Sequence, residues 1–176
     1  MSDEKHPSAK DYAAPQPSDW CAGCGNFGIL RAIQGALAEL ALPPGQVAVF
    51  GGIGCSGKTP YYLTTNGIHT LHGRVLPFAQ GAKLANPALT VLAVGGDGDG
   101  LSIGAGHFVS AARRNVDLTY ILFNNGVYGL TKGQFSASAD VGSKSKKGEA
   151  NAQAPIDPVL LALSLGATFV ARSFSG

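Results

Sequence analysis

Charge is scarce in this sequence. Only 14% of its 176 residues are charged, while 45% are apolar and 25 are glycine. So little charge on a chain of about one domain predicts that large surfaces are buried against partners; an apolar α/β domain is the alternative. The net charge of +2, with basic residues scattered except around Lys144, Lys146 and Lys147, argues against a nucleic-acid partner.

Long apolar runs and cysteines are also scarce. No segment reaches the roughly 20 apolar residues that span a bilayer, and residues 1–20 contain no apolar core like that of a signal peptide. We therefore expect no association with a membrane. Cys21 and Cys24 form a C-x-x-C, and Cys55 is the only other cysteine. An odd count without a secretion signal argues against a disulfide framework and for a reduced compartment, the cytoplasm.

Helix and strand patterns alternate through most of the chain. Residues 1–17 have three prolines and no periodicity, so we predict an N-terminal arm followed by one domain over residues 18–176. Apolar spacing predicts helices over 26–40, 75–87, 102–114 and 157–166, and strands over 46–50, 89–96, 118–123 and 167–172. This order predicts an α/β fold with a doubly wound, mostly parallel sheet.

Three predicted strands end in glycine-rich turns, at residues 51–57, 95–100 and 124–126. Ligands of such sheets bind at the carboxyl ends of the strands, so these turns are candidates for one shared site. Residues 142–155 are a polar segment, which we interpret as a solvated loop, with a mobile lid or docking loop as the alternative. Because the sequence ends directly after a predicted strand, we expect a chain that is cut short or completed by other subunits.

The stretch GGIGCSGKTP, residues 51–60, matches a nucleotide-binding loop. Gly52, Gly57, Lys58 and Thr59 satisfy the G-x-x-x-x-G-K-[ST] spacing. A phosphate loop must lead straight into a helix whose N-terminus faces the phosphates. The residues after Thr59, PYYLTTNG, make a long helix hard to start. A phosphate-loop nucleotide hydrolase is therefore an alternative function that the context does not favour.

The second glycine-rich turn, GGDGDG at residues 95–100, carries acidic side chains. Asn125 stands 28 residues after Asp97, at the end of the next predicted strand. Adjacent parallel strands would bring the two side chains together, and oxygen ligands suit magnesium. A G-D-G followed at this spacing by N-N is the signature of thiamine-diphosphate enzymes, with magnesium ligands at Asp97, Asn125 and the carbonyl of Val127. Two unrelated polar turns are the alternative.

The cysteines by themselves are consistent with several sites. WCAGCGNFG could be a zinc half-site, a redox pair or part of an iron-sulfur site, and Cys55 supplies a third ligand. His69 and His72 are possible fourth ligands, although a turn or a cofactor contact is favoured for them. A zinc-stabilised scaffold is therefore the non-enzymatic alternative.

Taken in order, WCAGCGN, GIGCSGK, HTLHGR, GGDGDGLSIGAGHF, RRN and NNGVYGLTKGQ resemble the β subunit of 2-oxoacid:ferredoxin oxidoreductases. The resemblance runs from Trp20 to Gly176 and is closest to the 2-oxoglutarate type, particularly through NNGVYGLTKGQ and LALSLGATFVAR. It implies the thiamine-diphosphate-binding fold, with thiamine diphosphate and Mg²⁺ bound between this chain and an α subunit that supplies the activating glutamate.

The resemblance also implies an activity and a cluster. The activity is coenzyme A-dependent oxidative decarboxylation of a 2-oxo acid, expected to be 2-oxoglutarate, with ferredoxin as electron acceptor. Cys21, Cys24 and Cys55 match three ligands of a 4Fe-4S cluster. The fourth family cysteine lies in a C-terminal stretch that these residues lack, so we expect either a fragment or an incomplete cluster.

The substrate is an anion, which draws attention to two lysines. Lys58 is expected to bind the reacting carboxylate, and Lys132 resembles the family position that reads the distal end of the substrate. Leu130 is expected to line the same pocket; a solvated lysine is the alternative for each cation. The residues expected around the cofactor are Gly54, Cys55, Ser56, His72, Gly73, Arg74, Gly96, Asp97, Gly98, Asp99, Asn125, Val127, Tyr128, Gly129 and Leu130.

Overall fold

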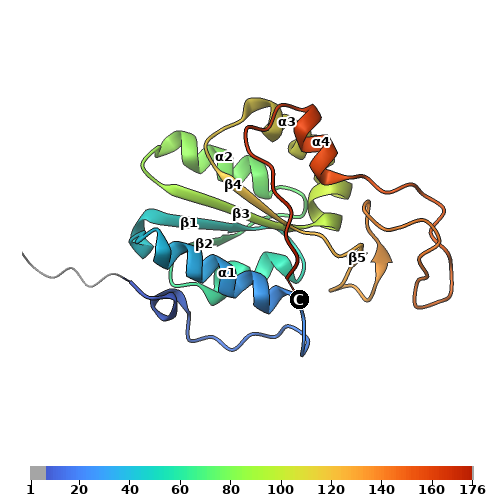
Figure 1. Cartoon of the computed structure of the whole chain (residues 1–176), viewed down its shortest axis with the longest axis horizontal. Coiled ribbons are helices and arrows are strands. Elements are labelled where there is room, and N and C mark those ends of the chain that lie inside the picture. Colours follow the sequence, from blue (N-terminus) through green and yellow to red (C-terminus); the bar gives the residue numbers. More distant parts are fainter. Residues whose placement is uncertain (1–6, 176) are drawn as a thin grey trace, which may run out of the picture.

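The structure is a computed structural model that describes residues 7–175, and a four-stranded parallel sheet lies at its centre (Figure 1). In the sheet order β2-β1-β3-β4, the strands are β2 (Asn66–His69), β1 (Val47–Gly51), β3 (Thr90–Gly96) and β4 (Thr119–Phe123). The α-helices are α1 (Asn26–Glu39), α2 (Val75–Ala85), α3 (Ala105–Arg114) and α4 (Pro158–Ser164).

Several shorter elements connect these strands and helices. They are the 3-10 helices η1 (Ala9–Tyr12), η2 (Pro44–Gln46) and η3 (Ser56–Tyr62), the π-helix η4 (Gly98–Ile103), and the antiparallel hairpin of β5 (Val127–Tyr128) and β6 (Gln134–Phe135). Among the described residues, no helix has both the length and the apolar character that crossing a membrane requires.

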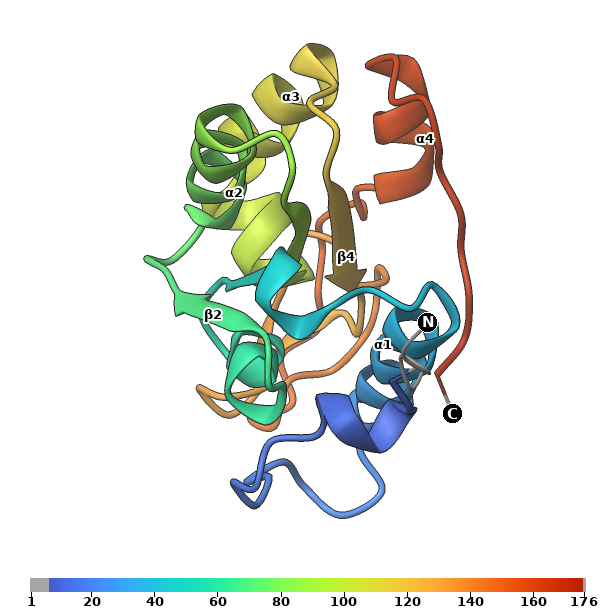
Figure 2. The same ribbon diagram turned by 90° about the vertical axis from the view of Figure 1, so that its left-hand side faces the viewer.

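Helices cover both faces of the sheet, because the side chains of a strand alternate between its faces. Val47 and Val49 of β1 pack in one buried cluster with Ile33 and Leu37 of α1. The intervening β1 side chains, Ala48 and Phe50, pack with Val75, Leu76 and Ala79 of α2 and Phe108 of α3. Figures 1 and 2 show α1 on one face and α2 with α3 on the other. The predicted doubly wound, parallel α/β fold is confirmed.

The predicted helices are present with small shifts. The helix after Asp157 begins as expected, because the Asp157 carboxylate accepts hydrogen bonds from the N–H groups of Val159 and Leu160 and Pro158 occupies the first helical position. The helix predicted from Ser102 begins later. Residues 98–103 form the π-helix instead, and α3 starts only after Gly104.

The strand predicted over residues 167–172 is wrong. This segment runs extended after α4 without strand pairing, and Phe169 is 84% exposed. Thr168 ties this segment to the end of α3, because its N–H and hydroxyl both donate to the side-chain oxygen of Asn115, the C-cap residue of that helix. An apolar alternating pattern fits a strand, but a strand also needs a partner whose backbone groups lie in register.

The sequence pattern missed β2 and the β5–β6 hairpin. All four residues of β2 are exposed, so this edge strand has no apolar alternation to reveal it. β2 pairs with β1 in parallel, because the crossover that contains η3 returns the chain so that both strands run in the same direction.

The predicted arm packs on the domain through Tyr12. This side chain is fully buried, and its hydroxyl donates a hydrogen bond to the carbonyl of Leu37 at the end of α1. Ala13 also pairs with Leu63. Residues 1–6 of the arm lie outside the described residues, and the boundary at residue 17 stays a prediction.

Candidate functional site

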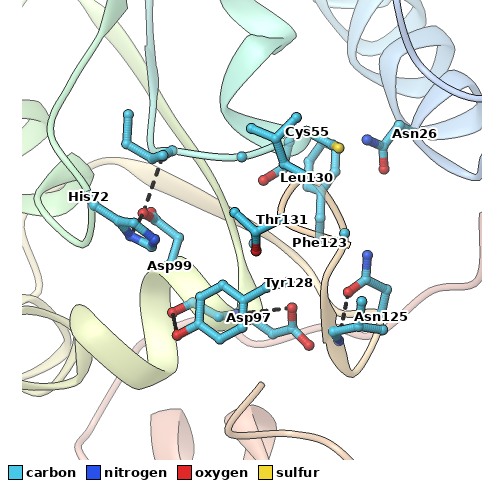
Figure 3. A pocket seen from close by; sticks show the side chains of 17 residues that line it. Asn26, Cys55, His72, Asp97, Asp99, Phe123, Asn125, Tyr128, Leu130 and Thr131 are labelled. Carbon is cyan, nitrogen blue, oxygen red and sulfur yellow. Dashed lines mark hydrogen bonds and ion pairs between the residues drawn. The ribbon is translucent and has the colours of Figure 1, made fainter. Parts of the chain in front are cut away.

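A pocket opens at the carboxyl ends of β1, β3 and β4, between these strand ends and the β5–β6 hairpin (Figure 3). All three predicted glycine-rich turns contribute to it. Its lining residues are Asn26, Ile53, Gly54, Cys55, Ser56, His72, Gly96, Asp97, Gly98, Asp99, Phe123, Asn125, Val127, Tyr128, Gly129, Leu130 and Thr131.

Asp97 and Asn125 come together at one end of this pocket (Figure 3). The parallel register pairs Gly96 of β3 with Phe123 of β4, so both side chains leave the sheet at the same edge. Asp97 is 1% exposed and accepts a hydrogen bond from the backbone N–H of Gly126 at 2.6 Å. The Asn125 side-chain oxygen accepts one from the N–H of Val127 at 3.0 Å. Oxygen atoms therefore gather where the sequence predicted a magnesium site.

The hairpin is pressed against the turn that carries Asp97. The Tyr128 hydroxyl donates to the carbonyl of Gly98 at 2.9 Å. A Cβ atom at residue 98 would lie 2.6 Å from the Tyr128 ring. Residue 98 must therefore be glycine for the ring to close this side of the pocket.

Asp99 joins three segments at the opposite end of the pocket. Its Oδ1 accepts hydrogen bonds from the N–H groups of Ile53 at 3.1 Å and Gly73 at 2.8 Å. The same oxygen lies 2.7 Å from Nδ1 of His72, and Figure 3 shows the two side chains facing each other. Asp99 is 2% exposed. Because Oδ1 holds the turn after β1 and the turn before α2, this carboxylate fixes His72 at the pocket wall.

A second buried polar group lies beside Asp99. The hydroxyl of Tyr120 and Oδ2 of Asp99 both lack a hydrogen-bond partner among the described residues, and both lie near Gly95. Burial raises the pKa of Tyr120, and the two neighbouring carboxylates, Asp99 and Asp97, raise it further. The phenol therefore stays neutral and adds no further negative charge beside the two carboxylates.

Three glycines of residues 51–57, Gly51, Gly52 and Gly57, lie where other atoms of the chain leave no room for a side chain. A Cβ atom at Gly57 would lie 1.8 Å from the carbonyl oxygen of Gly52. The segment that follows, Ser56–Tyr62, is a 3-10 helix with Pro60 inside it, and not an α-helix. The geometry of a phosphate loop, with a helix N-terminus aimed at the phosphates, does not form here.

The segment that carries Cys21 and Cys24 is held over the Cys55 turn. Trp20 donates its indole N–H to the carbonyl of Cys55 at 2.7 Å, and its ring packs edge-on against Tyr62. Asp19 forms an ion pair with Lys58 and accepts a hydrogen bond from the Tyr62 hydroxyl. These contacts bring the two cysteine segments to the same end of the molecule.

The described residues contain no preformed site for a single metal ion. Within residues 7–175, no three His, Cys, Asp or Glu side chains form a group that could hold a metal ion, and all three cysteines are free. Cys21 is exposed, whereas Cys55 lines the pocket. Burial raises the pKa of the Cys55 thiol, and Lys58 opposes that rise. Cys24 and Cys21 are near enough to Cys55 to raise its pKa as well.

The Asp19–Lys58 pair predicts a pH dependence. Hydrogen bonds from Lys58 and then from Tyr62 hold the pKa of Asp19 below its ordinary value of 3.8. A lowered pKa gives stability that is present above pH 3.8 and is lost as the pH falls through the folded-state value. Since Trp20 is the only tryptophan, its fluorescence should report release of this segment on acidification.

Asp19→Asn should remove that acid transition of the Trp20 emission. Asp117→Asn is the matched control, because it alters a carboxylate paired with Lys83 elsewhere on the surface. A transition of Trp20 at the same pH in wild type and Asp19→Asn would contradict this assignment.

Comparison with known proteins decides the family. Residues 43–175 match the family described as "Thiamine pyrophosphate enzyme, C-terminal TPP binding domain". The chain belongs to this family. The TPP-binding domain therefore spans all four strands of the sheet and the whole pocket except Asn26.

Two curated relatives show which kind of TPP enzyme the chain is similar to. The chain is 59% identical over 161 residues to the 2-oxoacid:ferredoxin oxidoreductase subunit beta of Saccharolobus solfataricus, covering 90% of this chain and 53% of that protein. It is 47% identical to the 2-oxoglutarate oxidoreductase subunit KorB of Mycobacterium tuberculosis, covering 93% and 44%. The predicted resemblance to these β subunits is confirmed. The chain spans about half the length of these relatives.

A solved structure agrees with these relatives. The 2-oxoglutarate:ferredoxin oxidoreductase from Magnetococcus marinus with 2-oxoglutarate, coenzyme A and succinyl-CoA bound superimposes with a TM-score of 0.91 at 43% identity. The match covers 96% of this chain and 58% of that one. The fold of the TPP-binding domain is thus shared with an enzyme of known structure.

The pocket suits thiamine diphosphate together with a divalent cation. Asp97 and Asp99 both line it, whereas no Lys or Arg does within the part of the chain that the structure describes. A diphosphate beside two buried carboxylates would be repelled unless a cation lay between them. The oxygen donors of Asp97, Asn125 and Val127 have the chemistry that Mg²⁺ prefers.

Some predicted site residues lie outside the pocket lining. Gly73 donates its N–H to Asp99, and Arg74 contacts His107. Lys58 is paired with Asp19, and Lys132 is exposed in the turn of the hairpin. Cys21 and Cys24 lie on the segment above the Cys55 turn. The roles predicted for these residues stay predictions.

Four lining residues were missed by the sequence analysis: Asn26, Ile53, Phe123 and Thr131. Ile53 and Phe123 carry no polar group that could have marked them. Asn26 is a buried polar residue at the start of α1. Thr131 lies between the predicted site residues Leu130 and Lys132. The positions of these two residues in the sequence could therefore have marked them as site candidates.

Proposed function

We propose that this chain is the thiamine-diphosphate-binding β subunit of a 2-oxoacid:ferredoxin oxidoreductase. Its reaction is the coenzyme A-dependent oxidative decarboxylation of a 2-oxo acid, with 2-oxoglutarate as the preferred substrate, in the cytoplasm. Its partners are an α subunit and ferredoxin. The observation that carries the proposal is the pocket at the strand ends, which gathers Asp97, Asn125 and Val127 in a TPP-binding domain.

The cofactor assignment follows from the oxygen atoms of this pocket. Asp97, the Asn125 side chain and the Val127 carbonyl would hold Mg²⁺, which would in turn bind the diphosphate. Thiamine diphosphate supplies the reactive carbon and the electron sink for decarboxylation. Cys55 and Leu130 would line the region where the substrate meets the cofactor, and His72 would be held there by Asp99.

Lys58 is proposed to bind the reacting carboxylate of the substrate. Its ammonium pairs with Asp19, and the hydrogen bond to Asp19 raises the pKa of Lys58. The lysine is therefore charged at neutral pH, and a substrate carboxylate would compete with Asp19 for it.

Lys132 is proposed to bind the distal carboxylate, which predicts a substrate-selective effect. Lys132→Ala should lower kcat/KM for 2-oxoglutarate by about tenfold or more, because a hydrogen bond to a charged group contributes about 1.5–3 kcal/mol. Pyruvate lacks the second carboxylate, so its turnover should change little. Steady-state kinetics with both substrates checks this.

Lys144→Ala is the control for that experiment, since Lys144 is exposed in a segment away from the pocket lining. Equal losses for 2-oxoglutarate and pyruvate in Lys132→Ala would exclude the distal-carboxylate role.

A 4Fe-4S cluster is proposed to involve Cys21, Cys24 and Cys55. The support is that Trp20 and Asp19 hold the two cysteine segments together. Since the sequence has three cysteines, the cluster would need a further ligand. Iron and sulfide analysis of anaerobically purified protein tests this, and zinc without iron would favour the scaffold alternative.

The decisive test of the function is anaerobic co-expression of the chain with an α subunit. The purified complex should contain thiamine diphosphate and should reduce a low-potential acceptor when given coenzyme A and a 2-oxo acid. A panel of 2-oxo acids then ranks the substrates. A complex that binds no thiamine diphosphate would refute the proposal.

A further inference from the structure

The two oxygens of the Asp97 carboxylate have different surroundings. Oδ2 accepts three hydrogen bonds, from the N–H of Gly126 at 2.6 Å and from the hydroxyls of Ser136 at 2.7 Å and Ser138 at 2.6 Å. Oδ1 accepts one, from the N–H of Gly98 at 3.0 Å. A carboxylate offers about four acceptor sites, so Oδ2 is saturated and Oδ1 keeps a free lone pair.

The Ser138 hydroxyl is itself oriented by a neighbour. Its oxygen lies 2.6 Å from Oδ2 of Asp97 and 2.6 Å from the Asn124 side-chain atom placed as Oδ1, so two acceptors face a hydroxyl that carries one proton. Both contacts are satisfied when the amide NH₂ of Asn124 donates to Ser138 and Ser138 donates to Asp97. The oxygen and nitrogen of an amide are assigned from such networks. With the Asn124 amide turned over in this way, its NH₂ directs the Ser138 proton at Oδ2 of Asp97.

The serines reach Asp97 from a distant part of the sequence. They follow β6, about 40 residues after Asp97, and Ser136 is fixed by its own N–H, which donates to the carbonyl of Gly126 at 3.2 Å. Ser136 is 7% exposed. The hydroxyls are therefore held by the same hairpin that closes the pocket, and they occupy the side of the carboxylate away from its free lone pair.

We propose that Ser136 and Ser138 are positioning residues for cation binding: they anchor Oδ2 of Asp97 so that Oδ1 is the atom presented to the divalent cation. This inference rests on the proposed function, because the cation is the one that would bind the diphosphate. Mutation of a residue that hydrogen-bonds to a metal-ligating side chain commonly lowers the affinity for the metal by about 10–100-fold.

The test measures Mg²⁺ affinity of the complex of the full chain with its α subunit. Mg²⁺ is titrated by calorimetry in the presence of saturating thiamine diphosphate. Ser136→Ala and Ser138→Ala should each raise the apparent Kd for Mg²⁺ by about tenfold. Ser138→Thr, which restores a hydroxyl, should recover most of the affinity. Ser164→Ala is the control, because that exposed hydroxyl bonds only to the Leu161 carbonyl of its own helix.

A purely structural role predicts a different result. The serines would then lower the melting temperature without changing Mg²⁺ affinity, so the melting temperature is measured without metal for every variant. Asn124→Ala keeps the test usable if a serine variant does not fold, because Asn124 is exposed; it should weaken Mg²⁺ binding several-fold.

The outcomes separate the two proposals. If wild type binds Mg²⁺ with thiamine diphosphate and the serine and Asn124 variants bind it within twofold of wild type, the positioning role is overturned. If wild type binds neither, the proposed function fails instead.

Discussion

Gly57→Ala is expected to prevent the chain from folding stably. The new Cβ would lie 1.8 Å from the carbonyl oxygen and 2.5 Å from the carbonyl carbon of Gly52. Both are backbone atoms of a buried turn, so neither can rotate away as the end of a side chain could. Overpacking in a core costs about 1–3 kcal/mol when side chains can adjust, and a backbone clash should exceed that range. The measurement is the urea midpoint of unfolding.

Gly106→Ala provides the matched control. Gly106 lies in α3, where an added Cβ meets nothing within 4 Å. This variant should be at least as stable as wild type, since alanine is a better helix former than glycine. A urea midpoint of Gly57→Ala equal to that of Gly106→Ala would contradict the close contact between the turn residues.

Asp97→Ala should abolish Mg²⁺-dependent binding of thiamine diphosphate. The carboxylate is the one negatively charged group in the proposed ligand set, and removing one partner of a buried charge pair costs about 3–5 kcal/mol. That loss corresponds to about 100-fold or more in affinity. Calorimetric titration of thiamine diphosphate into the complex with the α subunit, with and without Mg²⁺, measures it.

Folding must be controlled in this experiment, because Asp97→Ala leaves the Ser136 and Ser138 hydroxyls without their acceptor. Asp97→Asn keeps the shape and removes the charge, so it should retain more stability and still lose the Mg²⁺ dependence. Asp117→Ala changes an exposed carboxylate and should bind like wild type. Unchanged cofactor affinity in both Asp97 variants would remove the magnesium site.

The nucleotide-loop pattern shows how far a motif can be interpreted without its surroundings. Its glycine spacing fits a phosphate cradle, but Gly52 and Gly57 touch each other's backbone, and the residues that follow form a 3-10 helix. The poor helical character of PYYLTTNG was visible in the sequence. The contact between Gly52 and Gly57 was not, because it depends on how the turn folds back on itself.

Local patterns in the sequence determined the class of fold and the place of the site. Apolar runs marked β1, β3 and β4, and glycines marked their ends, because both reflect short-range constraints on the backbone. Adjacent parallel strands then required Asp97 and Asn125 to share one edge. These inferences need only the order and length of the elements.

Contacts between distant segments were decided only by the tertiary structure. Ser136 and Ser138 anchor Asp97, and Lys58 pairs with Asp19, although no local pattern relates these parts of the chain. Residues 167–172 run extended without strand pairing, which also depends on what lies beside them. A side chain's hydrogen-bond partner is set by which surfaces pack together. The spacing of apolar residues indicates which face of a helix or strand is buried. Which residues lie against that face is determined by the tertiary packing.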